Sequence, residues 1–77
     1  MMGENFITVK EFSKKFGDRL REKCVKEKKT LLRLSDDTGI GHSTLSYYLH
    51  GEVAPSAYNI YRIAKAFDCD INELIDF

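Results

Sequence analysis

The side chains whose types and spacing suggest chemistry lie close together in the segment HSTLSY. They are His42, Ser43, Thr44, Ser46 and Tyr47. Their hydroxyl and imidazole groups donate and accept hydrogen bonds but carry no fixed charge. Such groups are suited to recognising the polar edges of a ligand. A Ser and a His near each other could act as a nucleophile and its base, but exposed Ser and His side chains on one short helix are far more often ordinary surface residues. No catalytic residue is therefore predicted.

Two short helices are predicted to position these side chains. Thr30 caps a helix over residues 31–37, and Gly39 stops it. A second helix follows over residues 42–50, and Gly51 ends it. Two helices joined by a Gly-containing turn are the arrangement by which a helix-turn-helix places its second helix in the major groove of DNA.

A longer helix precedes this pair. Thr8 and Glu11 have the spacing of a capping box, so the helix is predicted to begin at Val9 and to fade near Lys28. Its apolar face recurs every four residues at Phe12, Phe16, Leu20 and Cys24. We expect Gly17 to lower the stability of this helix by about 1 kcal/mol relative to Ala, or to bend the helix at that position.

Two further helices follow the pair. Ser56 caps a helix over residues 57–67, and Asp70 with Glu73 resembles a second capping box at the start of a short fifth helix. The predicted class is therefore all-α, with a single domain over residues 1–77. Residues 1–8 are predicted to form a flexible or capping N-terminal arm.

The composition limits the chain to one small core. It has 77 residues, of which 43% are hydrophobic, and no apolar run approaches the roughly 20 residues of a membrane span. The N-terminus lacks the pattern of a secretory signal. Cys24 and Cys69 are far apart and fit no CxxC pattern. We expect a cytoplasmic protein with two reduced thiols.

The charges are distributed unevenly although the net charge is zero. Residues 10–29 hold nine Lys or Arg against four acidic residues, whereas residues 52–77 hold two against five. A polarity of this kind can orient a protein on an anionic surface, and a solvated helix face is the alternative interpretation.

Six short motifs in this order resemble the Cro/phage-repressor helix-turn-helix family, also called the XRE class. They are FGDRLRE from Phe16, LSxxTGI from Leu34, STLS from Ser43, GxxxPS from Gly51, IAKAF from Ile63 and INELI from Ile71. Together they cover residues 16–75, and their joint spacing is specific. The resemblance implies a five-helix, lambda-repressor-like domain with an embedded helix-turn-helix that regulates transcription by binding DNA.

The resemblance also assigns contacts. Base contacts would fall on the start and outer face of the third helix, at His42, Ser43, Thr44 and Tyr47. Phosphate contacts would fall on helix N-termini and nearby side chains, at Lys28, Lys29, Thr30, Arg33, Ser46, His50 and Ser56. The implied partner is double-stranded DNA, bound by a symmetric homodimer at two half-sites about one helical turn apart. The fifth helix, ending in Leu74, Ile75 and Phe77, is the first candidate for the dimer interface, and the N-terminal extension is the second.

Several departures from the family favour an alternative. The loop after Gly51 reads Glu52-Val53-Ala54 where the family usually carries Lys or Arg, and the third helix has no Arg, Lys or Gln. Leu31 and Leu32 stand where polar residues are common, so we expect at least one to be exposed. The alternative is the same fold used as a protein-interaction module, such as an antirepressor, an antitoxin or a complex subunit.

A coupled departure predicts one contact. The family often pairs an Arg of the first helix with a Glu near the end of the third, and the matching positions here are Cys24 and Leu49. Packed apolar groups can replace a buried ion pair without loss of stability. We therefore expect these two side chains to touch.

No cofactor, metal or small-molecule ligand is predicted, nor any membrane contact. His42 and His50 would lie more than about 10 Å apart along one helix, too far to share a metal ion. Both cysteines fall in the core pattern, and a bundle of this size offers little room for a pocket.

Overall fold

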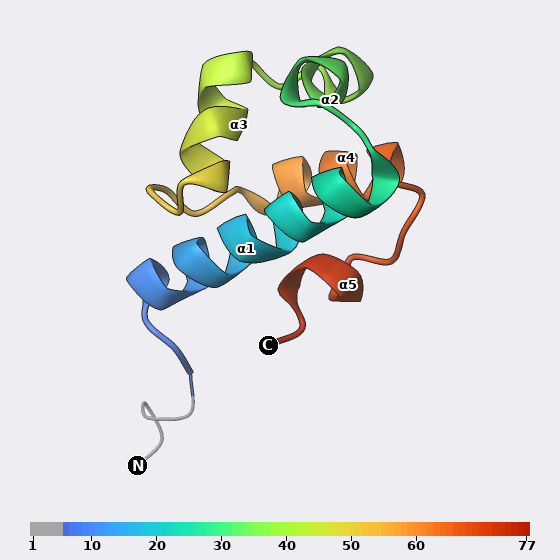
Figure 1. Cartoon of the computed structure of the whole chain (residues 1–77). Helices are drawn as coiled ribbons and strands as arrows, with labels where there is room; N and C mark the ends of the chain where they lie inside the picture. Colours follow the sequence, from blue (N-terminus) through green and yellow to red (C-terminus); the bar gives the residue numbers. More distant parts are fainter. Residues whose placement is uncertain (1–5) are drawn as a thin grey trace.

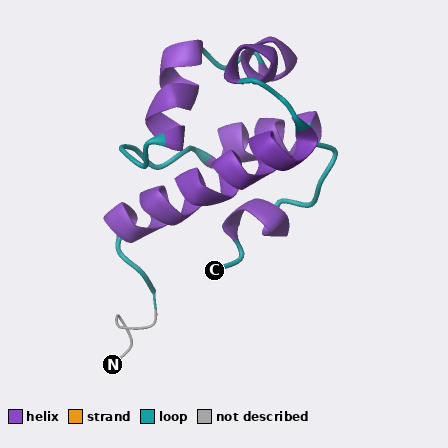
Figure 2. Ribbon diagram, viewed as in Figure 1, coloured by secondary structure: helices purple, strands orange, loops and turns teal. Residues whose placement is uncertain are grey.

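The computed structural model describes residues 6–77, and their regular structure is entirely helical (Figures 1 and 2). Five helices follow one another: α1 (Val9–Glu27), α2 (Leu31–Thr38), α3 (His42–Leu49), α4 (Ala57–Ala66) and α5 (Asn72–Ile75). The predicted five-helix all-α class is confirmed. The first five residues of the predicted N-terminal arm lie outside the described residues.

Helix α1 crosses the middle of the molecule, with α2 and α3 on one side and α5 on the other (Figure 1). It packs against both α3 and α5, whereas α2 packs against α3 and α4. The helix-turn-helix formed by α2 and α3 is therefore supported from below by α1 and α4.

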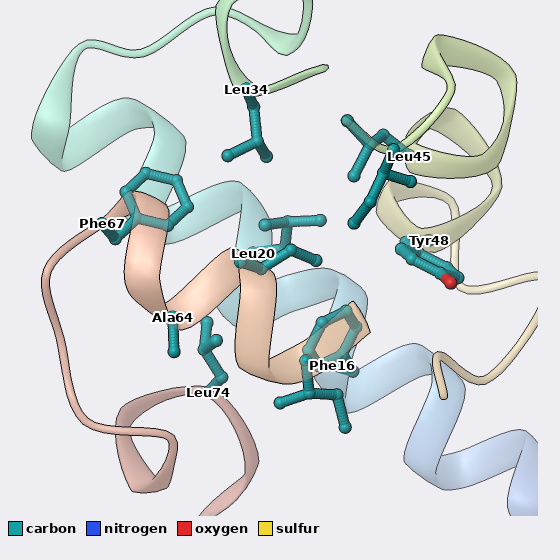
Figure 3. Close-up of a cluster of buried hydrophobic side chains, with 11 residues drawn as sticks. Phe16, Leu20, Leu34, Leu45, Tyr48, Ala64, Phe67 and Leu74 are labelled. Carbon is teal, nitrogen blue, oxygen red and sulfur yellow. The ribbon is translucent and has the colours of Figure 1, made fainter. Parts of the chain in front are cut away.

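A single apolar core joins all five helices (Figure 3). The largest fully buried side chains are Phe16 and Leu20 from α1, Leu34 from α2, Leu45 from α3, Ile63 from α4 and Leu74 from α5. Burying a side chain of this size contributes about 1.5–3 kcal/mol. Because α2 and α3 each contribute a buried leucine, the core holds the helix-turn-helix to its support.

The predicted caps of α1, α2 and α4 are present. Thr8 and Glu11 form the complete capping box, with each side chain accepting from the other residue's backbone N–H. Thr30 and Ser56 start α2 and α4, and each hydroxyl oxygen accepts a backbone N–H at 3.1 Å. Each bond satisfies an amide that would otherwise lack a partner in the first turn.

The start of α5 differs slightly from the predicted capping box. The Glu73 carboxylate does accept from the backbone N–H of Asp70, at 3.4 Å. The Asp70 carboxylate, however, accepts from the N–H of Asn72 rather than from that of Glu73. The helix consequently begins at Asn72, one short turn that buries Leu74.

Gly17, which is expected to weaken or bend α1, lies within an unbroken helix. The helix runs without a break from Val9 to Glu27, and Gly17 is buried within it. A Cβ at this position would lie 2.6 Å from the carbonyl oxygen of Tyr48 and 3.0 Å from that of Leu49. The missing side chain therefore lets the end of α3 rest directly on the backbone of α1.

Candidate nucleic-acid interface

The four side chains predicted to contact bases lie on α3 as expected: His42, Ser43, Thr44 and Tyr47. His42, Ser43 and Tyr47 are exposed, and the Tyr47 side chain reaches 52% of its full accessibility. Thr44 is half-buried. The opposite side of α3 carries Leu45 and Tyr48, which are buried in the core. Helix α3 thus presents a polar, uncharged outer face to solvent.

Ser46 and His50 form a small unit at the end of α3. The His50 ring lies with Nδ1 2.8 Å from the carbonyl oxygen of Ser46, a geometry in which Nδ1–H donates. This bond fixes the tautomer, so that Nε2 of the neutral ring is an acceptor. Only the imidazolium form of His50 would present an N–H at Nε2 to an anion.

Near the start of α2 lie the Thr30 hydroxyl and two cationic side chains, Lys28 and Arg33, which differ in whether an acidic side chain lies beside them. Thr30 accepts from the backbone N–H of Arg33 and keeps its own hydroxyl proton to donate. The Arg33 side chain is 70% exposed and lies 3.3 Å from Asp37. Lys28 is exposed, and within residues 6–77 it makes no ion pair. Its left-handed conformation, at φ 54°, ends α1 beside the start of α2.

Lys29, for which the sequence predicts a phosphate contact, makes several contacts within the chain. Its ammonium donates to Asp37 at 2.7 Å and to the carbonyl oxygen of Ala66 at 2.9 Å, and it lies 5.4 Å from the centre of the Phe67 ring. Only 18% of the side chain is exposed. Lys29 therefore joins α2 to the end of α4, and its charge is already matched. The hydrogen bond from Lys29 is the main reason that the pKa of Asp37 lies below its ordinary value.

Two of the cationic side chains of α1 already bind α5 and the residue that follows it. The Lys23 ammonium lies 2.5 Å from the Glu73 carboxylate, and this hydrogen bond raises the pKa of Lys23 and lowers that of Glu73. Arg19 donates to the carbonyl oxygens of Glu73 and Asp76. In the described part of the chain, the lysines without an ion pair are Lys10, Lys14, Lys15, Lys26, Lys28 and Lys65.

Two of these lysines, Lys10 and Lys14, lie beside the turn that follows α3. A Cβ at Gly51 would lie 3.0 Å from Cα of Lys14, and Lys10 lines a groove together with Glu52 and Val53. The loop itself carries no cation. The sequence analysis counted both lysines in the basic segment 10–29 but did not place them beside this turn, because the register between the start of α1 and the turn after α3 follows from the close approach at Gly17 and Gly51.

The start of α4 keeps its predicted role as a capped, exposed N-terminus. Ser56 is exposed, and its oxygen accepts from the backbone N–H of Asn59. On α2, Leu32 is 65% exposed whereas Leu31 packs against the core, which confirms that at least one of the pair faces solvent. Cys24 and Leu49 both pack half-buried against the core, and their mutual contact stays a prediction.

No group of three or more metal-ligating side chains gathers anywhere in residues 6–77. Cys24 and Cys69 are free and half-buried, and burial raises the pKa of both thiols. None of the described helices is both long enough and apolar enough to cross a membrane.

Comparison with known proteins agrees with this geometry. A family model described as helix-turn-helix matches residues 20–74. The crystal structure of the restriction-modification controller protein C.AhdI from Aeromonas hydrophila is similar at a TM-score of 0.77 and 31% identity, covering 80% of this chain and 94% of that one. No curated protein matches the chain. The family match spans most of the chain and includes α2 and α3, so the chain belongs to the helix-turn-helix family, in its Cro/C1-type class of DNA-binding transcriptional regulators.

Proposed function

We propose that this protein is a dimeric, sequence-specific regulator that reads the major groove of its operator with α3. The observation that carries the proposal is the outer face of α3, where exposed hydrogen-bonding side chains stand opposite a fully buried Leu45. A helix of this kind, supported by a preceding helix across a tight turn, is the reading element of a helix-turn-helix. The likeness to C.AhdI favours the role of a small controller of gene expression.

The base contacts are assigned to His42, Ser43, Thr44 and Tyr47. The two hydroxyls at the start of α3 can donate to or accept from several base edges, and the Thr44 methyl can meet a thymine methyl. The Tyr47 ring offers apolar area beside a polar hydroxyl. Because none of these groups carries a fixed charge, their selectivity comes from hydrogen-bond geometry and from apolar contact with thymine methyl groups.

The phosphate contacts are assigned to groups on both sides of α3. Lys28, Thr30 and Arg33 lie at the start of α2, and Ser56 lies at the start of α4. Ser46 and the imidazolium form of His50 complete the set at the end of α3. Lys29 is left out, because its ammonium already binds Asp37 and Ala66. Contacts of this kind fix the register of a protein on the duplex without reading sequence.

We propose that two copies bind two half-sites about 34 Å apart, one turn of the duplex. The uncharged reading face of one copy gives modest affinity, and a second copy adds a second set of contacts to the same DNA. Of the residues first considered for the interface, Leu74 is fully buried within its own chain. Of those residues, an interface at α5 would therefore use the half-buried Ile75 and the exposed Phe77.

Selection of bound duplexes from a random pool tests the proposal. The expected result is one enriched, palindromic motif whose affinity falls steeply as salt is raised. His42→Ala and Tyr47→Ala should change the preferred bases, whereas Lys28→Ala should weaken all duplexes alike and reduce the salt slope by about one. Lys65→Ala is the matched control, because Lys65 is an exposed lysine of α4 that is assigned neither a DNA contact nor a place at the proposed interface. The absence of binding to any duplex at low salt would refute the proposal.

The second candidate function, a protein-interaction module, is favoured by a specific observation. Leu32, Tyr58 and Tyr61 are large side chains that are 65%, 63% and 47% exposed, and none of them faces the core. Tyr58 and Tyr61 stack on each other with ring centres 6.3 Å apart. If DNA selection yields nothing while Leu32→Ser or Tyr61→Ser abolishes capture of a defined protein partner, this second function replaces the first.

A further inference from the structure

A line of polar contacts crosses α4 and joins α3 to the turn that follows α2. The Tyr48 hydroxyl oxygen accepts from the Asn59 side-chain amide at 2.8 Å. The Asn59 side-chain oxygen accepts from Arg62 at 2.7 Å. The other terminal nitrogen of Arg62 donates to the carbonyl oxygen of Thr38 at 3.0 Å. Three side chains, Tyr48, Asn59 and Arg62, thus connect the two helices of the helix-turn-helix through α4.

The far end of this line lies at the turn itself. Thr38 is the last residue of α2, and Gly39 follows it at φ 76°. The Thr38 hydroxyl donates to the carbonyl oxygen of Leu34 and accepts from the backbone N–H of Ile40, so the turn is bonded on both sides. A Cβ at Gly39 would lie 3.4 Å from the donating nitrogen of Arg62. Arg62 therefore rests directly against the backbone that sets the direction of α3.

Packing alone does not explain an arginine at position 62, because placing its charge here has a free-energy cost. Its Nε is buried without a hydrogen-bond partner, and among the described residues it forms no ion pair. Its charge is met only by the Tyr58 ring, 4.7 Å away, and by two neutral oxygens. Removing a charge from water without a charged partner costs free energy, and an apolar side chain of similar size would fill the same space without that cost. What an apolar side chain cannot supply is the pair of directional bonds, to Thr38 and to Asn59.

We propose that Arg62 is a positioning residue for operator reading. It holds the turn after α2 directly and orients Asn59, which bonds the buried side of α3, and so sets how the outer face of α3 meets the base edges. This inference rests on the proposed function. It assigns Arg62 an effect on discrimination between sequences, not a contact with DNA. Recognition of bases by hydrogen bonds is sensitive to the position of α3, because a small displacement of the helix distorts the distance and angle of every hydrogen bond to a base.

The test compares Arg62→Met with the wild type on the selected operator and on a scrambled duplex at the same salt. Arg62→Met keeps length and apolar contact but removes both directional bonds. The ratio of the two affinities is expected to fall about tenfold, as for loss of one charge-assisted hydrogen bond. Scrambled-duplex affinity and the salt slope should stay as in the wild type, because no phosphate contact is lost. Lys65→Met is the matched control: its ammonium lies over the exposed Tyr61 ring at 5.8 Å on the same helix, and its ratio should not change.

Tyr48→Phe gives an independent readout if Arg62→Met does not fold. It keeps the ring, which packs edge-on against Phe16, and removes only the hydroxyl that ends the line. A smaller fall in the same ratio is expected. A folded Arg62→Met, or failing that Tyr48→Phe, with an unchanged ratio overturns the inference. So does an equal loss on both duplexes with a lower salt slope, which would make Arg62 a phosphate contact. A wild type that does not discriminate between the duplexes refutes the proposed function instead.

Discussion

Adding one methyl group at Gly17 should destabilise the protein, although the same change stabilises most helices. Gly17 lies in the interior of α1, where alanine is ordinarily preferred by about 1 kcal/mol. In this structure the new Cβ would meet three backbone atoms: the carbonyl oxygen of Tyr48 at 2.6 Å, that of Leu49 at 3.0 Å and the nitrogen of Gly51 at 3.3 Å. All three belong to the end of α3 and its turn, and none is the movable tip of a side chain.

The size of the effect follows from these distances. An ordinary contact at Tyr48 requires the end of α3 to move away from α1 by about 0.8 Å, which separates Leu45 and Tyr48 from the core. Overpacking of this kind costs about 1–3 kcal/mol, and contacts with backbone belong at the upper end because the backbone relaxes least. After the gain in helix propensity is subtracted, Gly17→Ala should lower the free energy of unfolding by about 1–2 kcal/mol.

Urea denaturation followed by circular dichroism measures this change. Gly41→Ala is the matched control: at φ −59° it is unstrained, and the nearest atom to its Cβ is the Thr44 hydroxyl at 4.0 Å. It should cost less than Gly17→Ala. Because the displaced segment ends the reading helix, Gly17→Ala should also weaken the selected operator more than a scrambled duplex. A Gly17→Ala protein as stable as the wild type, or more stable, would refute the close approach of α1 and α3.

Three further substitutions test other parts of the structure. Asp37→Asn should remove a pH-dependent stabilisation: the pKa of Asp37 is lowered when folded, so its contribution is present above its ordinary value of 3.8 and is lost as the pH falls through the lower folded value. The difference in Tm between wild type and Asp37→Asn should therefore shrink between pH 7 and pH 3, and a constant difference would contradict the Lys29–Asp37 bond. Ser56→Ala should cost about 1 kcal/mol in urea denaturation through loss of the α4 cap, and no loss would mean that the cap is not formed in solution. Leu45→Ala should cost about 2–5 kcal/mol by the same measurement, and a cost below 1 kcal/mol would place α3 outside the core.

The helices could be predicted because their signals are local. The caps at Thr8, Thr30 and Ser56 and the apolar spacing behind them lie within a few residues of the elements they define. Observed helix ends lie within one residue of those predicted for α2, α3 and α4. The polar outer face of α3 followed from the same periodicity, since the buried Leu45 determines which side chains face outward.

What could not be predicted depends on contacts between residues far apart in the chain. The contacts of the Lys29 ammonium with Asp37 of α2 and Ala66 of α4 could not be read from its neighbours in sequence. Gly17 was interpreted as a weak point from its low helix propensity. Its packing role was not visible in the sequence, because the carbonyl oxygens that approach it belong to residues more than thirty positions later. The role of Arg62 was missed for the same reason, since a single cation in a helix pattern carries no sign of a distant turn.

The attachment of α5 to α1 has a consequence for the order in which the molecule assembles. The bonds from Arg19 and Lys23 to Glu73 and Asp76 close loops of 50 to 57 residues, the longest among the side-chain hydrogen bonds of the described chain. Closing a long loop costs slightly more chain entropy than closing a short one, and α5 is a single short turn at the end of the described chain, so we expect α5 to dock last and to detach first. Its Lys23–Glu73 ion pair also weakens in salt. A salt series on DNA binding will therefore loosen the protein's own C-terminal attachment along with its contacts to phosphate, and hydrogen exchange of α5 in the free protein would separate the two.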